Sequence, residues 1–400
     1  MPRLREVPPT AGLPLCWRDF LPAPEHLLES ALAAFLHLPP VQIECSGTAA
    51  LMVALMTFKG LSTRRSVVVP AYTCPLVVLA IAQCGLKPVL CDLRADHFDL
   101  DLQGLDAVCG DDTLAIVPTH LGGRVADVSS VIEIARRVGA VVIDDAAQAL
   151  GATWRGQAVG TLGDAGFYSL AVGKGLTLYE GGVLLARETG LRQQMRKVSA
   201  QIAPSRPAWE LRRLVQLAGY AALYRPLGLY FVHGIPQRRA LRQGKLIEAV
   251  GDDFNASLPV HRVGAWRRAI GANALARLPS FLETLSTQAM RRKAQLAALA
   301  GLRVIDDPQH GCGTWPFFMV LMPTAQTRDA ALSRLWRTGL GVSRLFIHAL
   351  PDYAYLAASL GRVEVPNARD FAARLLTISN SPWLRDEDFK WICSVLAESV

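Results

Sequence analysis

A single lysine among small residues is the strongest chemical signal in this sequence. Lys174 lies in residues 167–175 (FYSLAVGKG), and residues 180–182 (EGG) follow closely. Upstream, residues 140–145 (AVVIDD) form an apolar run that ends in Asp145. A desolvated lysine amine can form a Schiff base with an aldehyde, while a carboxylate can keep a pyridine nitrogen protonated. Both groups have ordinary alternatives, a surface lysine and a turn aspartate, but together they predict a catalytic pair in a pyridoxal phosphate site.

Strand-like and helix-like patterns alternate around these two residues, from about residue 41 to 190. Such alternation predicts a mostly parallel α/β sheet that is sandwiched by helices. In such sheets functional groups collect at the carboxyl ends of strands, where Asp145 and His120 fall. The expected strands are 67–70, 87–92, 114–118 and 141–145, and the expected helices are 76–84 and 128–138.

The second half of the chain predicts a smaller α+β C-terminal domain. A helical pattern with an apolar and a basic side is expected over residues 265–299, a strand over 315–322, and a final helix over 386–399 that Asp386 caps. We therefore expect three parts: a large cofactor-binding domain (1–205), an apolar and basic helical insertion (206–262) and the small domain (263–400).

Composition limits the classes of function. The 400 residues are 51% hydrophobic and 19% charged, which excludes a disordered or fibrous protein. A net charge of +8 suits acidic small molecules, a membrane surface or nucleic acid, but no zinc-finger or RNA-binding motif is present. We therefore expect no nucleic-acid partner, and no metal ion. The eight cysteines show no paired spacing and the first residues no apolar leader, so we expect buried free thiols and a cytoplasmic protein.

Residues 206–245 stand apart from the rest. Residues 211–236 are rich in Leu, Ala, Tyr and Gly, are interrupted by Arg225 and Pro226, and are flanked by arginines. The interruption argues against a membrane-spanning helix. A helical hairpin packed on the protein or at a subunit contact is the main expectation. Peripheral contact of residues 211–239 with an anionic membrane is the alternative, because arginines beside apolar and aromatic residues suit that boundary.

Several short motifs resemble, in order, those of the DegT/DnrJ/StrS family of nucleotide-sugar aminotransferases. Residues 45–51 (CSGTAAL) resemble the family's SGT-x-AL, and residues 117–123 (VPTHLGG) its VPVHLYG. Residues 144–152 (DDAAQALGA) resemble EDAAQAHGA, and residues 160–164 (GTLGD) resemble GSLGD. Residues 167–182 match the family's lysine segment, including its final EGG. The resemblance is strong over about residues 25 to 190 and loose over 265 to 400.

This resemblance implies a fold and a cofactor site. The fold would be aspartate-aminotransferase-like, which is fold type I of the pyridoxal phosphate enzymes. Asp145 would pair with the pyridine nitrogen and Lys174 would bind the aldehyde. Free amides at a helix start would hold the phosphate, although such a triplet is more often a plain helix cap. The implied cofactor-binding residues are Gly47, Thr48, Ala49, Tyr72, Asp145, Gln148, Ser169 and Lys174.

The sequence also departs from the family's pattern. Many relatives carry an aromatic residue where this chain has Cys74, so Tyr72 becomes the expected residue to stack on the cofactor, unless the ring is held differently. The family's G-x-N-Y-R element, which reaches a neighbouring subunit's site, is matched only by residues 264–268 without an Asn. Arg267 or Arg268 is the expected replacement. His120 is expected to contact the cofactor or substrate, unless it is a satisfied strand-end histidine, and His348 is a further candidate contact.

The activity implied by the resemblance is transfer of an amino group, commonly from glutamate, to a keto-sugar on a nucleotide. Its setting would be polysaccharide or secondary-metabolite biosynthesis, and relatives are homodimers. Relatives that dehydrate sugars carry His in place of the lysine, so Lys174 favours transamination. The rivals are a fold-related lyase acting on amino acids, and a non-catalytic relative with a regulatory or membrane-associated assembly role.

Overall fold

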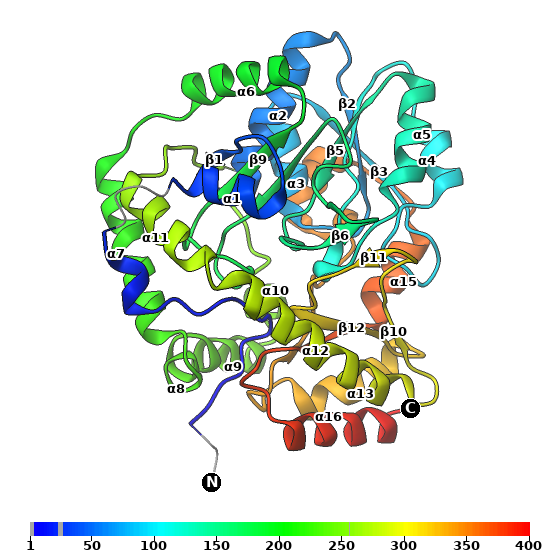
Figure 1. The fold of residues 1–400 in the computed structure, drawn as a ribbon. Coiled ribbons are helices and arrows are strands. Elements are labelled where there is room, and N and C mark those ends of the chain that lie inside the picture. Colours follow the sequence, from blue (N-terminus) through cyan, green and yellow to red (C-terminus); the bar gives the residue numbers. More distant parts are fainter. Residues whose placement is uncertain (1–3, 23–26, 256) are drawn as a thin grey trace.

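The computed structural model describes residues 4–22, 27–255 and 257–400, and its centre is a seven-stranded sheet (Figure 1). Five neighbouring strands run parallel, and two antiparallel strands complete one edge. Strands of such a sheet are buried on both faces, which explains the continuous apolar runs of β2 and β4. The order is β1 (Gln42–Glu44), β9 (Gly182–Ala186), β8 (Ala165–Ser169), β5 (Val141–Asp145), β4 (Thr113–Ile116), β2 (Ser66–Pro70) and β3 (Lys87–Cys91).

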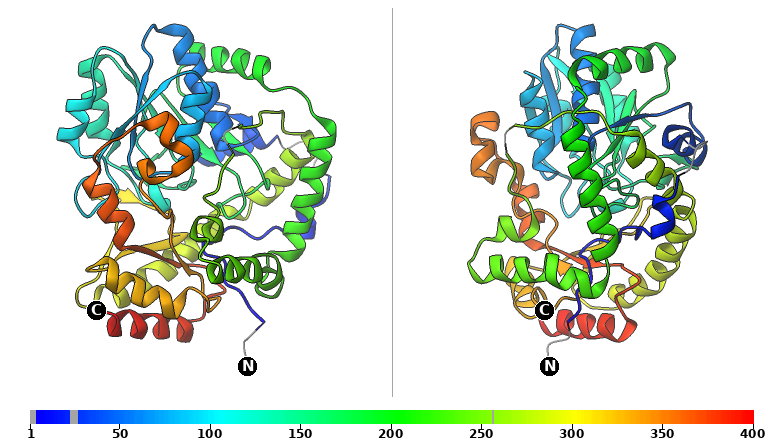
Figure 2. Two further views of the ribbon diagram at one scale, coloured as in Figure 1. Left: turned by 180° about the vertical axis from the view of Figure 1, so that it is seen from behind. Right: turned by 90° about the vertical axis from the view of Figure 1, so that its left-hand side faces the viewer.

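Helices cover this sheet on both faces (Figure 2). α2 packs on β8 and β9, whereas α5 packs on β4 and β5. Each of these helices starts at a side-chain cap: Ser46 accepts a hydrogen bond from Ala49 N, and Asp127 accepts one from Ser130 N. The helices of this part are α1 (Leu28–Leu36), α2 (Gly47–Leu61), α3 (Pro75–Gln83), α4 (Leu102–Val108), α5 (Val128–Val138) and α6 (Thr189–Ile202).

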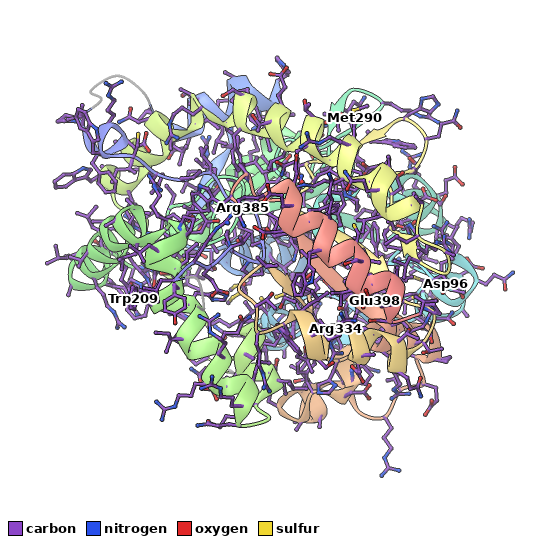
Figure 3. All side chains as sticks on the ribbon, turned by 90° about the horizontal axis from the view of Figure 1, so that it is seen from below. Asp96, Trp209, Met290, Arg334, Arg385 and Glu398 are labelled. Atoms are coloured by element: carbon purple, nitrogen blue, oxygen red, sulfur yellow. The ribbon has the colours of Figure 1, made fainter. Side chains whose placement is uncertain are left out.

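A four-stranded antiparallel sheet organises the C-terminal part. Its strands are β10 (Arg303–Val304), β12 (Phe317–Leu321), β14 (Leu375–Ser379) and β13 (Val342–Ser343). Figure 3 shows Arg334 and Glu398 close together on the outer face, where their 2.8 Å ion pair joins two helices. The helices of this part are α12 (Leu278–Ala297), α13 (Ala325–Leu335), α14 (Ala357–Leu360), α15 (Pro366–Arg374) and α16 (Asp386–Glu398), and a small third sheet consists of β6 (Thr153–Trp154), β7 (Gln157–Ala158) and β11 (Gly311–Cys312).

The segment between the two sheets is helical and runs down one side of the molecule (Figure 2). It breaks at Arg225 and Pro226, as the sequence indicates, and its buried side chains include Leu217 and Tyr220. No helix within the described ranges combines the length and apolar character that crossing a bilayer requires. The elements are α7 (Pro207–Leu223), α8 (Pro226–Leu229), a π-helical turn η3 (Tyr230–Gly234), α9 (Ile235–Arg242) and α10 (Leu246–Val250).

The predicted strands and helices of the large sheet are confirmed, with ends that shift by one or two residues. The helical pattern over 265–299 is confirmed, and the structure divides it into α11 (Ala265–Leu275) and α12, where the chain turns near Arg277 and Pro279 takes the second position of the new helix. One prediction for the second half is wrong. Arg385, not Asp386, is the cap residue of α16, and Asp386 is the first residue of the helix. The Asp386 carboxylate forms an ion pair with Arg291.

The eight cysteines are all unpaired thiols. Cys45, Cys84, Cys91 and Cys393 are buried as expected, but Cys312 is exposed. The domain boundaries stay a prediction; α11, assigned to the small domain, packs against α1 and against the short helix η1 (Trp17–Phe20) of the first range. The beginning of the N-terminal segment, at residues 1–3, lies outside the described residues.

Candidate active site

Asp145 ends β5 at the carboxyl edge of the large sheet, which is where the sequence pattern places it. The carboxylate accepts a 3.0 Å hydrogen bond from Ala147 N and a 3.4 Å bond from Thr119 Oγ1. No ion pair of Asp145 lies within the part of the chain that the structure describes. Burial raises the pKa of Asp145 to about 6, and the Ala147 amide, His120 and Lys174 offset only part of this effect.

Lys174 lies in the turn between β8 and β9 and faces the same cavity as Asp145. Gly173 precedes it with φ of 80°, a left-handed conformation that glycine adopts without strain. Burial lowers the pKa of the Lys174 amine, and the nearby Cys74 and Asp145 act in the opposite direction. The cavity has a volume of about 360 Å³. The two residues on which the predicted chemistry depends therefore meet in one site.

The start of α2 forms one wall of this cavity. Gly47 and Thr48 line the cavity together with Ser169 from β8. A Cβ at position 47 would lie 3.2 Å from Ser169 Cβ, so glycine permits this close approach. Ala49 does not line the cavity, and its amide donates to Ser46 Oγ at 2.9 Å. The structure therefore does not bring Ala49 to the cavity, because the helix cap occupies its N–H group.

The structure does not bring Tyr72, the expected stacking residue, to the cavity either. Tyr72 is 1% exposed, packs edge-on against Phe346 and Phe371, and donates a 3.1 Å hydrogen bond to the Phe346 carbonyl. It does not line the cavity; Cys74, at the start of α3, does. The aromatic side chains that reach the cavity are Phe167, Phe254 and Phe346.

His120 agrees with the alternative interpretation, in which it is a strand-end histidine whose ring nitrogens both have partners within the protein. It is fully buried: its Nε2 lies 2.7 Å from Asp144 Oδ1, and Ala126 N donates to its Nδ1 at 2.9 Å. Both ring nitrogens therefore have partners, and the ring does not line the cavity. Asp144 also accepts hydrogen bonds from the Gly160 and Leu162 amides. Residues 160–164 (GTLGD) therefore hold the Asp144 carboxylate in place.

The structure does not bring the other three candidate substrate residues to the cavity either. Arg267 is fully buried and its guanidinium pairs with Glu210 at 2.6 Å. Arg268 pairs with Glu29 at 2.7 Å on the outer side of α11. His348 packs edge-on against Tyr353, and its lowered pKa comes mainly from burial and secondly from Arg344. The contact expected of Arg267 or Arg268 is with a neighbouring subunit's site, so it stays a prediction.

Gln148 does line the cavity, and its position is fixed because its Oε1 accepts a 2.8 Å hydrogen bond from Gly122 N. Several further cavity residues were not predicted. Thr73 and Thr119, whose hydroxyls lie 3.3 Å apart, follow the carboxyl ends of β2 and β4, and this position could have identified them. The helical insertion also contributes residues, which no motif indicated: Val250, Gly251, Asp252 and Phe254.

Asp252 connects the insertion to the C-terminal part. Its carboxylate accepts hydrogen bonds from Tyr353 Oη at 2.7 Å and from Ile347 N at 2.9 Å. Burial raises the pKa of Asp252 to about 6, and the Tyr353 bond acts in the opposite direction. The cavity thus contains a buried amine, two buried carboxyls and the free amides of a helix start. This donor set fits a pyridoxal phosphate, with its phosphate at Gly47, Thr48 and Ser169 and its ring between Lys174 and Asp145.

Comparison with known proteins agrees with this geometry. The model of the DegT/DnrJ/EryC1/StrS aminotransferase family matches residues 24–221 and 244–397. The chain belongs to this family. Only the two ends of the chain and residues 222–243 of the insertion lie outside the match.

Two named relatives match this chain over part of their own length. The GDP-perosamine synthase of Caulobacter vibrioides is 38% identical over 169 residues, which is 42% of this chain and 45% of that protein. The UDP-N-acetyl-3-dehydro-alpha-D-glucosamine 3-aminotransferase of Acidithiobacillus ferrooxidans is 34% identical over 152 residues, 38% of this chain and 41% of that protein. The chain thus matches less than half the length of these relatives. The PLP form of Spr1654 from Streptococcus pneumoniae shares the fold, with a TM-score of 0.74 at 18% identity over 98% of each chain.

Proposed function

We propose that this protein is a pyridoxal-phosphate-dependent aminotransferase that transfers an amino group from glutamate to a keto-sugar, carried on a nucleotide. The observation that carries the proposal is the meeting of Lys174 and Asp145 in one cavity, beside the free amides of Gly47 and Thr48. Membership of the family and the names of the matched relatives support the sugar as acceptor. Biosynthesis of a polysaccharide or a secondary metabolite is the setting we propose.

Each residue has a distinct task. When bound, pyridoxal phosphate supplies a ring that accepts electrons from the bond being broken. Asp145 would hold a proton at the pyridine nitrogen, and the Gly47 and Thr48 amides with Ser169 Oγ would bind the phosphate. Lys174 Nζ would hold the cofactor covalently and, as a free amine, would move a proton at the substrate carbon. The lowered pKa of Lys174, which burial causes, favours the neutral amine that these tasks need.

The replacement Lys174→Ala tests this proposal. The purified wild-type protein with pyridoxal phosphate should show visible absorbance that shifts when L-glutamate is added. The Lys174→Ala protein should lose the covalent attachment, and its glutamate reaction should fall by about 10²–10⁴-fold, the usual worth of a general acid–base. Absorbance spectra before and after borohydride reduction make the measurement. Retention of reducible absorbance in Lys174→Ala would contradict the proposal.

We also propose a cytoplasmic homodimer. Eight unpaired thiols suit a reducing compartment. Side chains exposed on the insertion, such as Leu211 at 63% and Val215 at 64%, give it an apolar outer face that a second subunit could cover. Peripheral contact of residues 211–239 with anionic lipid is the second use of the same face, supported by its neighbouring arginines. Co-sedimentation with anionic vesicles at low salt tests the lipid contact, and no binding would remove it.

A further inference from the structure

A second cavity, of about 170 Å³, opens beside Lys174. Lys174 and Gln148 line both this cavity and the one that holds Asp145, so the two are adjacent parts of one site. The walls of the second cavity come from three distant regions: Thr10 near the N-terminus, Thr377 on β14, and His233 and Gln237 on the insertion. A molecule that reacts at the Lys174 amine would therefore contact the insertion.

His233 and Gln237 have no hydrogen-bond or ion-pair partner for their side chains among the described residues. Gln237 is only 7% exposed, and both side chains line the cavity. They lie four residues apart and hence on one face of the helical segment formed by η3 and α9. Neither side chain belongs to the described buried polar groups that lack a partner, so their polar atoms are open to the cavity. The two residues thus form an unused pair of polar groups in the cavity that Lys174 also lines.

The segment that bears them is fixed to the rest of the protein. Arg238, on the same helix, pairs with the buried Glu6 at 2.7 Å, and the Glu6 amide donates to the Pro226 carbonyl at 2.9 Å. Gly234 permits this contact, because a Cβ there would lie 2.1 Å from Glu6 Oε2. The π-helical turn η3, which contains both His233 and Gly234, is a feature that often occurs at functional sites. His233 and Gln237 are therefore pre-positioned.

The pair is not part of the family's common pattern. Residues 222–243 are the internal stretch that the family model leaves unmatched, and His233 and Gln237 both lie within it. The stretch therefore adds polar groups from outside the family match to a cavity that Lys174 lines. Residues outside the match suit the recognition of a substrate better than they suit the chemistry common to the family.

The composition of the cavity indicates which part of a substrate it would hold. Its polar lining is mostly uncharged, and its ionisable members are Lys174, His233 and Arg344. Arg344 donates through Nη2 to the carbonyls of Ile347 and Ala372, while its buried Nε has no partner among the described residues. Uncharged polar side chains outnumber the ionisable ones, and hydroxyl and amide groups suit the hydroxyls of a sugar ring. The uncharged polar side chains are Thr10, Gln148, Gln237, Thr314, Ser343 and Thr377.

We propose that His233 and Gln237 are specificity-determining residues that bind ring hydroxyls of the sugar substrate, with any nucleotide outside the cavity. This inference rests on the proposed aminotransferase function. The amide of Gln237 can both donate to and accept from a hydroxyl, and so can the two nitrogens of a neutral imidazole.

The test uses the cofactor-loaded protein and variants matched in chemistry. Gln237→Met and His233→Phe keep the approximate volume but remove the hydrogen bonds, and Gln237→Ala and His233→Ala are second variants in case the first fail to fold. Gln243→Met is the control, because Gln243 is an exposed residue at the end of the same helix. Calorimetry measures binding of three unreactive probes: UDP-N-acetyl-α-D-glucosamine, GDP-α-D-mannose and myo-inositol. Stopped-flow absorbance measures the reaction with L-glutamate.

We expect wild type to bind at least one probe, and each variant of the pair to raise its Kd about tenfold. The control should change Kd less than twofold and keep the glutamate rate within about twofold, and all folded variants should keep the visible absorbance of the bound cofactor. Equal Kd values for Gln237→Met, His233→Phe and the control would overturn the inference. So would no binding of any probe by wild type. Failure of the proposed function is distinguishable, because wild type would then show no response to L-glutamate.

Discussion

Burial of the Asp145 carboxyl destabilises the folded protein when no cofactor is bound. It is 2% exposed, and its hydrogen-bond partners are one backbone amide and one threonine hydroxyl. Burial raises the pKa of Asp145 to about 6, from an ordinary value of 3.8. A raised carboxyl pKa means that the folded state holds the proton more tightly than the unfolded chain does. The cost of the buried carboxylate is thus present above about pH 6 and disappears as pH falls through 6 toward 4.

The replacement Asp145→Asn should consequently have opposite effects in the two forms of the protein. Without cofactor at pH 8, the variant should be more stable than wild type by up to about 3 kcal/mol, from a pKa shift of roughly 2 units. The difference should shrink as pH falls from 6 to 4. With pyridoxal phosphate, the variant should lose activity by about 10²–10³-fold, since the pyridine proton loses its counter-charge. Urea denaturation with and without cofactor measures the first effect; a less stable ligand-free variant at pH 8 would refute this account.

His120 bonds to Asp144 and to the Ala126 amide and does not line the cavity, so we expect a structural role for it. His120→Phe should remove its bonds to Asp144 and to Ala126 N and lower the free energy of unfolding by about 2–4 kcal/mol, the sum of two lost buried interactions. The folded variant should keep its visible absorbance, and its KM for glutamate should change less than about twofold. Denaturation and half-reaction kinetics make the two measurements. Unchanged stability with a lost glutamate reaction would instead place His120 in contact with substrate.

At the scale of elements, Arg267 joins α11 to α7 and to the loop before β9. Its guanidinium bonds Glu210 and the Leu178 and Glu180 carbonyls from a fully buried position. Burial would raise the pKa of Glu210, but the hydrogen bond and charge of Arg267 bring it below its ordinary value. The pair is therefore a structural one that fixes the insertion against the large sheet.

The neighbouring arginines on α11 allow a matched comparison. Arg267→Met should lower the free energy of unfolding by about 3 kcal/mol, because it removes one partner of a buried pair. Arg268→Met removes a partly exposed pair with Glu29 and should cost at most about 1 kcal/mol. Chemical denaturation of both variants measures the difference. Equal losses would show that burial of Arg267 does not determine its contribution.

The large sheet could be predicted from the sequence because its strands are continuous apolar runs separated by short capped helices. Val141–Asp145 and Val128–Val138 have the predicted bounds, and Lys174, Asp145, Gly47 and Ser169 meet as the motifs indicate. The errors concern the direction in which side chains point. Tyr72 and Cys74 are two residues apart in one turn, and the packing of Phe346 and Phe371 decides which of them reaches the cavity. Such long-range packing leaves no local signal in the sequence.

On the scale of the whole molecule, the site depends on regions far apart in the chain. The N-terminal segment, the insertion and the C-terminal sheet meet around Lys174, where Thr10, Gln237 and Thr377 line one cavity. Glu6 and Val7 bond to Pro226 and Gly339, and so connect all three regions. These contacts involve single residues separated by hundreds of positions, which no periodic pattern reveals. The sequence predicts a helical hairpin packed on the protein or at a subunit contact, and the structure adds that residues of this insertion line both cavities.

The outer face of the insertion gives the last prediction. Leu211 and Val215 lie one turn apart on α7 and are both more than 60% exposed, whereas Leu217 and Tyr220 on the same helix are buried. If this face is a subunit contact, light scattering should give the wild-type protein a mass of twice its chain mass of 43.4 kDa. The double replacement Leu211→Glu and Val215→Glu should then yield monomers, because two carboxylates would be buried without partners. Arg239→Gln, an exposed change on α9, is the control and should stay dimeric. A dimer that survives the double replacement, with anionic vesicle binding lost, would assign this face to the membrane surface instead.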